Sequence, residues 1–239
     1  MLFFYIRHGD PIYNPDELTP LGKRQAEAAA KRLALYGIDR IFASTSNRAI
    51  QTATPTCELL KKEMTLLDFT NEHHAYMDFS IIKEDGERIW AIEELKTRRL
   101  LTSAEMKALG DAWYTHPDLP KCNWEGGIKR IQKGTDDFLF SLGYEHVPGT
   151  GTYKVIQSNK ERVALFAHNN FGMGFLSSLL DIPYPAVCSH FSMGHSGITV
   201  INFEEDEDGY CSPVILTLAS DAHLYHEGLP TKYNNSIYF

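Results

Sequence analysis

Two histidines and two arginines have the side chains that a phosphate-ester site needs. His8 follows Arg7 at the end of an apolar run. His168 directly follows a second apolar run, and Arg48 lies near the start of a predicted helix. A guanidinium binds phosphate oxygens through paired hydrogen bonds, and a neutral imidazole is a competent nucleophile near neutral pH. These residue types suit a phosphoryl-transfer site in which His8 attacks phosphorus.

Buried strands of a parallel sheet must position these side chains. The apolar runs at residues 2–6 and 163–167 are typical of strands covered on both faces, and residues 40–43 predict a shorter strand. In open α/β sheets, ligands bind beyond the carboxyl ends of the strands, where helix N-termini add free N–H groups. The residues that follow these strands should therefore meet at one rim of the sheet.

Helical patterns alternate with these strands. Thr19 and Pro20 predict a helix start, and Gly37 predicts its end. A second helix is expected over residues 47–62, with a kink or restart at Pro55. The alternation favours an α/β fold with a parallel sheet. Further helices are predicted at residues 128–142 and 172–180, and a hairpin at residues 198–203 and 214–218.

Composition restricts the partners. The net charge of −8 disfavours nucleic acid and anionic membranes, so an anionic substrate needs a local group of cations. No stretch approaches the length of a membrane span or the pattern of a signal peptide, so we expect a cytoplasmic protein. The cysteines are too scattered for a disulfide framework or a zinc site: Cys57, Cys122, Cys188 and Cys211.

The residues around these positions resemble the histidine phosphatase superfamily, which includes the cofactor-dependent phosphoglycerate mutases. The most specific similarity covers roughly the first quarter of the chain. Its stretches are YIRHGDPIYN from Tyr5, LTPLGKRQA from Leu18 and IFASTSNRAIQTA from Ile41. A later stretch, VALFAHNN from Val163, is also similar.

The resemblance implies the fold: a three-layer α/β/α sandwich with a mostly parallel central sheet, as in phosphoglycerate mutases. It implies one domain over residues 1–239, in which residues 78–152 form a helical insertion that caps the active site. Trp90 and Trp113 in this segment either line a substrate pocket or belong to the core. Its cations either contact a second anionic group or form a solvated helix face: Lys96, Arg98 and Arg99.

The resemblance also implies roles for the site residues. His8 would become phosphohistidine, while Arg7, Arg48 and His168 would hold the phosphoryl oxygens and stabilise the transition state. Water would then hydrolyse the intermediate, with no metal and no cofactor. Two asparagines, Asn14 and Asn169, complete the expected substrate-binding set.

The general acid is the open member of this site. An alkoxide leaving group needs a proton, which a carboxyl group kept protonated by its surroundings can supply. Residues 67–74 resemble the family segment that carries the acid, so we assign this role to Glu72. A solvated loop glutamate is the competing interpretation. Three other carboxylates are alternatives: Asp68, Glu93 and Glu94.

We therefore expect a metal-independent phosphomonoester hydrolase of the histidine acid phosphatase type that acts on a small phosphorylated substrate. A phosphoglycerate mutase-type phosphotransferase is an alternative, but the stretch after Glu72 lacks the glycine and arginine of such mutases. A non-catalytic phospho-ligand-binding module and a metal-dependent hydrolase are further alternatives, and the ten histidines show no HExxH pair. The substrate's identity and the oligomeric state stay open.

Overall fold

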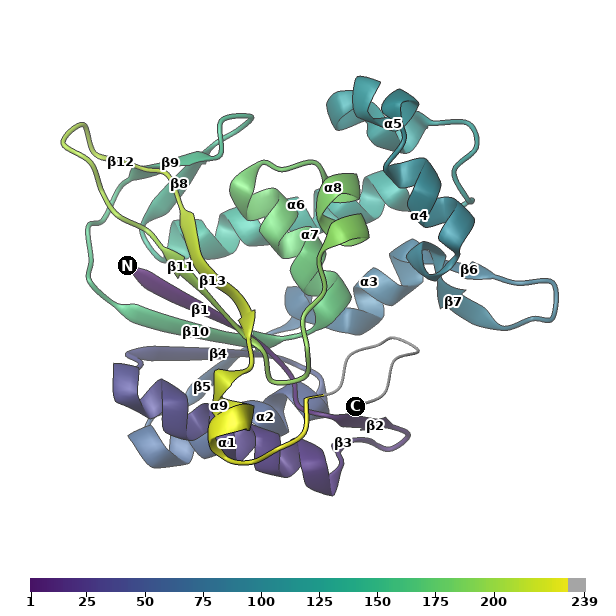
Figure 1. Cartoon of the computed structure of the whole chain (residues 1–239). Helices are drawn as coiled ribbons and strands as arrows, with labels where there is room; N and C mark the ends of the chain where they lie inside the picture. The colour runs from purple at the N-terminus through teal and green to yellow at the C-terminus, as the bar shows by residue number, and fades with distance from the viewer. Residues whose placement is uncertain (232–239) are drawn as a thin grey trace.

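A six-stranded sheet forms the middle of the molecule (Figure 1). The computed structural model describes residues 1–231. Six strands build the sheet: β1 (Leu2–Arg7), β4 (Arg40–Ser44), β5 (Met64–Leu67), β10 (Arg162–Ala167), β11 (Ile198–Asn202) and β13 (Val214–Ser220). Their spatial order is β13-β11-β1-β10-β4-β5. The strands at residues 2–6, 40–43 and 163–167, and the hairpin partners near the C-terminus, are confirmed.

The strand directions decide which chain segments share a rim. β1, β10, β4 and β5 pair in parallel, so their carboxyl ends lie together. β11 pairs antiparallel with β1, with Ile198 opposite Ile6. The chain just before β11 therefore reaches the same rim as the chain just after β1, and Ser196 N donates to His8 O at 3.0 Å.

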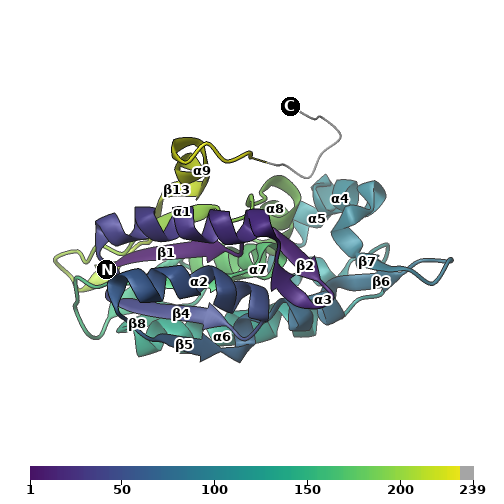
Figure 2. The ribbon, with the colours of Figure 1, turned by 90° about the horizontal axis from the view of Figure 1, so that it is seen from below.

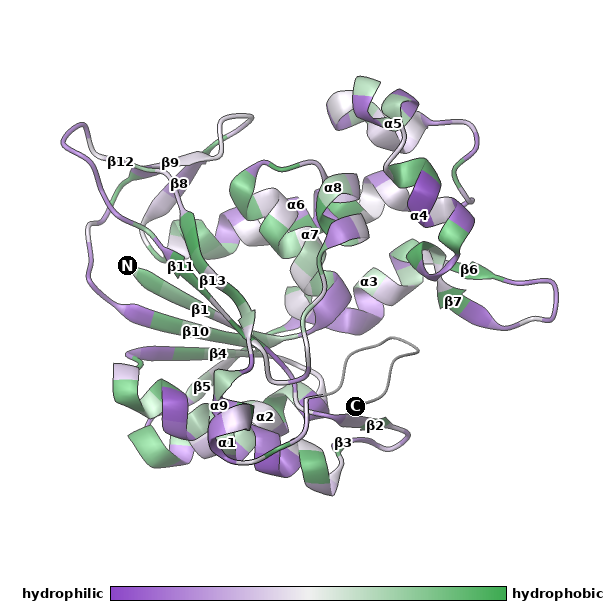
Figure 3. Cartoon of the chain, viewed as in Figure 1, coloured by the Kyte–Doolittle hydropathy of each residue, from purple (hydrophilic) through white to green (hydrophobic). Residues whose placement is uncertain are grey.

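Alternate side chains of the sheet face two separate helical layers. Phe3 and Tyr5 lie in one buried cluster, and Phe4 and Ile6 lie in another. Burying each such side chain contributes about 1.5–3 kcal/mol. Figure 3 shows apolar residues gathered on the central strands β1 and β10. The first cluster includes residues of α6 (Trp124–Ser141) and α7 (Asn169–Leu180), and the second includes residues of α1 (Pro20–Tyr36) and α2 (Asn47–Leu60).

These layers make the predicted three-layer α/β/α sandwich. Seen from below, α1 and α2 run alongside the strands of the sheet (Figure 2). The predicted caps of α1 are confirmed, because Thr19 accepts a bond from Gly22 N and Gly37 adopts a left-handed φ of 69°. The predicted restart at Pro55 is wrong, since α2 continues through it as one helix. Proline lacks an N–H and crowds the carbonyl four residues earlier, but buried Ala53 and Cys57 hold the helix against the sheet.

The segment at residues 78–152 contains two kinds of structure. Its first part, residues 80–123, projects beyond the sheet (Figure 1). It consists of the hairpin β6 (Ser80–Ile82) and β7 (Arg88–Trp90) and the short helices α4 (Leu95–Leu101) and α5 (Ala104–Ala108). The later α6 instead packs against α7 in the main layer. That the whole segment is one capping insertion stays a prediction.

The remaining elements are short. A hairpin forms between β8 (Tyr144–Val147) and β9 (Thr152–Val155). Within residues 1–231, no helix is long and apolar enough to cross a membrane. The other elements are β2 (Pro11–Tyr13), β3 (Asp16–Leu18), α3 (Glu72–Phe79), α8 (Tyr184–His190), β12 (Tyr210–Cys211), α9 (Ala222–His226), and 3₁₀ turns at Asp68–Thr70, Ala91–Glu93 and Gly110–Thr115.

Candidate active site

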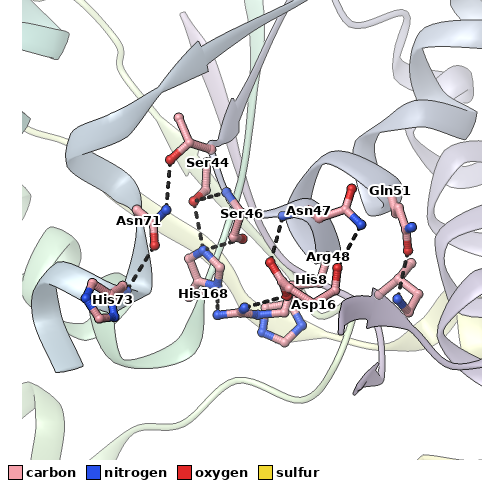
Figure 4. Close-up of polar contacts among 12 residues, drawn as sticks. His8, Asp16, Ser44, Ser46, Asn47, Arg48, Gln51, Asn71, His73 and His168 are labelled. Atoms are coloured by element: carbon pink, nitrogen blue, oxygen red, sulfur yellow. Dashed lines mark hydrogen bonds and ion pairs between the residues drawn. The ribbon is translucent and has the colours of Figure 1, made fainter. Parts of the chain in front are cut away.

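The four predicted phosphate-site residues meet at the rim where β1, β4 and β10 end, and Figure 4 shows three of them, His8, Arg48 and His168. His8 and His168 have ring centroids 5.2 Å apart, and both side chains are buried. Arg7 is buried beside them, and Arg48 reaches His168 from the first turn of α2. The four side chains therefore lie together at one rim of the sheet, as the strand ends predict.

His8 has one nitrogen fixed by its own backbone neighbour. Its Nδ1 lies 2.7 Å from the Gly9 carbonyl oxygen. A carbonyl oxygen can only accept, so Nδ1 carries the proton and Nε2 keeps its lone pair. The ring is thus held in the tautomer that a nucleophile needs.

The loop that carries His8 is packed tightly against the start of α1. A Cβ built on Gly9 would lie 2.6 Å from the Gly22 carbonyl oxygen, and one on Gly22 would lie 2.2 Å from the Asp10 carbonyl oxygen. Gly9 N also donates to Thr52 Oγ1 at 3.0 Å. Only glycine fits this close approach, which keeps the His8 backbone in one position.

His168 is oriented from both ring nitrogens. Arg48 Nη2 lies 3.2 Å from Nδ1, and a guanidinium only donates, so Nδ1 accepts. The Nε2 proton then points at Ser44 Oγ (2.9 Å) and Ser46 Oγ (3.2 Å). Tyr5 holds the backbone, since its hydroxyl donates to His168 O at 2.6 Å. Every hydrogen bond of this residue therefore suits a neutral imidazole.

Burial and positive charge keep both histidines neutral. Burial lowers the pKa of His8 well below 6.5, and His168, Arg7 and Arg48 lower it further. Burial lowers the pKa of His168 well below 6.5 in the same way, with contributions from Arg48 and Arg7. A neutral His8 at neutral pH is available as a nucleophile without first losing a proton.

Each arginine is anchored by the protein at both terminal nitrogens. Arg48 Nη1 donates to Asp16 Oδ1 at 2.7 Å, and its guanidinium lies over the Tyr13 ring, 5.3 Å from the centroid. Arg7 Nη1 donates to Met193 O, and Arg7 Nη2 lies 2.9 Å from His195 Nε2. These contacts leave part of each guanidinium free for another acceptor.

The unused donors are buried. Among the described residues, neither Arg7 Nε nor Arg48 Nε has a hydrogen-bond partner, and both atoms are shielded from solvent. An unsatisfied buried N–H costs about 1–3 kcal/mol. An anion that accepted both bonds would remove that cost, so the two guanidiniums suit a phosphoryl group.

Glu72 is the first residue of α3, and its carboxyl group lies against the N-terminus of α7. Its two carboxylate oxygens accept from Asn170 N at 3.0 Å and from Phe171 N at 2.8 Å. Burial raises the pKa of Glu72 above 4.5, although these two amide bonds and the nearby arginines oppose the shift. The charges of Arg48 and Arg7 act on it, so the carboxyl group belongs to the same rim. Its assignment as the acid stays a prediction.

The other expected residues are not part of the buried cluster. Asn14 is exposed between β2 and β3. Asn169 uses its side-chain oxygen to accept from Met193 N at 2.8 Å, so it holds the 192–193 loop. Among the alternative acids, Asp68 is mostly exposed, and a hydrogen bond from His74 lowers its pKa. The structure therefore favours Glu72 over Asp68 as a proton donor.

Two residues at the rim escaped the sequence analysis. Asp16 accepts from Arg48, and it also accepts from Asn47 N at 2.8 Å. His195 lies with its ring centroid 5.7 Å from that of His8. The position of His195 just before a strand was a usable signal, because the start of an antiparallel strand lies at the same rim as the ends of its neighbours.

The structure also bears on the metal alternative and on the side chains of the 78–152 segment. Within residues 1–231, no three His, Cys, Asp or Glu side chains are grouped so that they could hold a metal ion. Trp113 is a core residue, 3% exposed, packed between Trp124 and Tyr184. Lys96 is exposed and lies 3.5 Å from Glu94.

Comparisons with known proteins agree with this geometry. Residues 3–85 match the family model of the histidine phosphatase superfamily (branch 1). No curated protein matches the chain by sequence.

Solved structures share the fold across nearly the whole chain. A mutant phosphoserine phosphatase from Entamoeba histolytica, bound to phosphoserine, is 22% identical with a TM-score of 0.61, and the match covers 93% of this chain and 98% of that one. A mycobacterial glucosyl-3-phosphoglycerate phosphatase is 17% identical with a TM-score of 0.59, over 92% and 98% of the two chains. At these identities the likeness shows the fold alone. The similarity to the histidine phosphatase superfamily that the sequence predicts is therefore confirmed, by the family model over residues 3–85 and by a shared fold over more than nine-tenths of the chain.

Proposed function

We propose that this protein is a metal-independent phosphomonoester hydrolase of the histidine acid phosphatase type that works through a phosphohistidine on His8. One observation carries the proposal. The Gly9 carbonyl holds the proton on His8 Nδ1, which leaves Nε2 nucleophilic beside the guanidiniums of Arg7 and Arg48, whose buried Nε atoms have no partner among the described residues. A phosphoryl group completes the hydrogen bonding of this cluster.

The first half-reaction forms the intermediate. The His8 Nε2 lone pair attacks phosphorus, and the bond from phosphorus to the ester oxygen breaks. The Glu72 carboxyl group gives its proton to the departing alkoxide. Arg7 and Arg48 stabilise the charge that develops on the equatorial oxygens, and they do so without rearrangement because the protein already anchors them.

The second half-reaction restores the enzyme. Water attacks the phosphorus of phosphohistidine and loses a proton to the Glu72 carboxylate. The P–N bond breaks, phosphate leaves, and His8 returns as a neutral imidazole. Glu72 thus acts as acid and then as base, with a pKa that burial raises toward the working range.

We favour hydrolysis over a mutase reaction, because the stretch after Glu72 lacks the glycine and arginine of phosphoglycerate mutases and two lysines of the projecting segment are already paired. A bisphosphorylated intermediate needs a second anion site. Lys83 lies 3.7 Å from Asp85, and Lys96 lies 3.5 Å from Glu94, so these cations are already paired with carboxylates. The substrate we propose is a small phosphate monoester. The names of the structural neighbours suggest phosphoserine and glucosyl-3-phosphoglycerate as the first compounds to test.

The test is the hydrolysis of an aryl phosphate by wild type and by His8→Ala, in excess chelator. Aryl leaving groups need little protonation, so this assay examines His8 separately from Glu72. We expect chelator-resistant turnover by wild type and loss of about 1,000-fold or more in the variant. A matched control is His226→Ala, whose histidine is 83% exposed on α9 and should be dispensable.

Four outcomes would refute the proposal. Full activity of a folded His8→Ala protein would exclude the nucleophile. Loss of wild-type activity on chelation would point to a metal-dependent hydrolase. Phosphate binding without turnover of any aryl or alkyl ester would indicate a binding module, and rapid phosphoglycerate interconversion without phosphate release would indicate a mutase.

A further inference from the structure

Each arginine of the site contacts one imidazole. Arg48 Nη2 lies 3.2 Å from His168 Nδ1, and Arg7 Nη2 lies 2.9 Å from His195 Nε2. The first pair joins residues of the predicted site. The second pair brings in a residue that the proposed reaction does not use.

The contacts of His195 determine its tautomer. Its Nε2 must accept, because the Arg7 guanidinium only donates. Its Nδ1 then carries the proton and points at Asp10 Oδ1, 3.3 Å away. Asp10 is itself fixed, since its Oδ2 accepts from Thr19 Oγ1 at 2.7 Å and its backbone N donates to Gln25 Oε1 at 2.8 Å.

The backbone holds His195 beside the nucleophile. Arg7 N donates to Gly197 O at 3.1 Å, and Ser196 N donates to His8 O at 3.0 Å. Ser196 is also tied to α9, with its Oγ 2.9 Å from His223 Nε2. The 194–197 turn therefore moves as one unit with the His8 loop.

We propose that His195 is a positioning residue for phosphoryl transfer: oriented by Asp10, it holds Arg7 so that the remaining guanidinium donors meet the phosphoryl oxygens. This inference rests on the proposed function. Arg7 Nη1 is bound to Met193 O, so the His195 contact fixes the second terminal nitrogen and with it the rotation of the guanidinium plane. Arg7 Nε, buried and without a partner among the described residues, is then kept for the phosphoryl group.

The expected effect falls on the chemical step. A fixed guanidinium contributes most where charge develops, so its loss of orientation lowers kcat more than it raises KM. A hydrogen bond to a charged group corresponds to a change of about 10- to 100-fold. With an aryl phosphate, we expect His195→Ala to lower kcat by that amount and to change KM by less than about threefold.

Two amide side chains of different length distinguish a positioning role of His195 from a purely structural one. In His195→Gln an amide oxygen can reach the place of Nε2, so we expect activity within about fivefold of wild type. In His195→Asn the amide ends near the place of Nδ1 and cannot reach Arg7, so we expect the full loss. His226→Ala serves as the matched histidine control. Equal activity of the Gln and Asn variants would overturn the inference, even if His195→Ala failed to fold.

A double-mutant cycle tests whether His195 acts through Arg7. Arg7→Lys keeps the charge but removes the Nη2 contact. In the Arg7→Lys background, His195→Ala should lower kcat by less than about twofold. An undiminished cost there, or an unchanged kcat in a folded His195→Ala protein, would overturn the inference. If His8→Ala is inactive while all His195 variants are normal, only this inference fails; if His8→Ala is active, the proposed function fails.

Discussion

The histidines at the two ends of α7 have pKa values shifted in opposite directions. At the N-terminal end, His168 caps the helix and is kept neutral by burial and by Arg48 and Arg7. At the C-terminal end, His146 lies 2.9 Å from Asp136 and 3.1 Å from Asp181. The nearby Asp136 carboxylate raises the pKa of His146, burial opposes this shift, and Asp181 adds a smaller upward contribution. The imidazole of His168 is thus held neutral, whereas the imidazole of His146 is favoured as a cation.

The carboxylates show the same contrast. At the N-terminal end, Glu72 accepts from two free amides of α7 and lies under the influence of two arginines. At the C-terminal end, Asp181 accepts from Gly151 N at 2.8 Å and from His146, so it joins the β8–β9 turn to the helix. Asp136 comes from α6 and completes that link.

The comparison teaches how to separate function from fold in this molecule. At the His146 end, each charge has an opposite charge beside it, which is the arrangement of a structural tie. At the His168 end, Arg7 and Arg48 lie beside two neutral imidazoles, which carry no charge to balance them, although Arg48 is also paired with Asp16 at 2.7 Å. A cation that lacks a full set of partners in a buried place costs free energy, so a bound anion would stabilise this end. We therefore expect changes at the two ends to affect different measurements.

The largest expected effect is that of Arg48→Ala. This change removes one of the two guanidiniums that stabilise the transition state, so kcat/KM for an aryl phosphate should fall by about 1,000-fold. The change also breaks the Arg48–Asp16 ion pair, but Asp16 is about one-third exposed, so solvent screening should limit the loss of unfolding free energy to about 1 kcal/mol or less. Steady-state kinetics and calorimetry check both parts. A variant that is unstable but fully active would reverse the comparison.

Glu72→Gln should have the next largest effect, and it should depend on the leaving group. Without a proton donor, hydrolysis of an alkyl phosphate should slow by about 100- to 1,000-fold, whereas an aryl phosphate should be hydrolysed within about tenfold of wild type in the phosphorylation step. Single-turnover kinetics with both esters measures this difference. Equal losses with the two esters would remove Glu72 from the role of acid.

At the other end of the helix, His146→Asn should lower stability rather than activity. It leaves Asp136 and Asp181 near each other without the imidazole between them. Because Asp136 is one-third exposed, solvent screening limits the cost to about 1–2 kcal/mol of unfolding free energy. Urea denaturation near pH 6, with the exposed His226→Asn as control, measures it. A large loss of kcat with unchanged stability would contradict the separation.

The smallest expected effect is the pH dependence of the difference in unfolding free energy between wild type and His146→Asn. A raised folded-state pKa means that His146 contributes fully below its unfolded pKa of 6.5 and contributes less as the pH rises through the raised value. The stability advantage of wild type over His146→Asn should therefore narrow by no more than about 1 kcal/mol between pH 6 and pH 9. Denaturation series at both pH values check this. An advantage that widens with pH would show that His146 is neutral in the folded protein.

The sequence by itself determined the features that local patterns encode. Apolar runs marked β1 and β10, and Thr19, Pro20 and Gly37 marked both ends of α1. Strand ends placed His8 and His168 at one rim, because side chains that follow parallel strands emerge on the same side. The continuous helix across Pro55 was not predictable, since the packing that holds it comes from distant residues.

Tertiary structure alone decided the electrostatics of the rim. No local pattern brings Asp16 to Arg48, or His195 to Arg7, because the first pair depends on the β2–β3 hairpin and the second on the antiparallel entry of β11. The neutral state of His8 follows from burial and from the distant residues His168 and Arg48, together with the adjacent Arg7. The sequence thus identifies the residues that can carry out the chemistry, and long-range packing determines which imidazole nitrogen carries the proton.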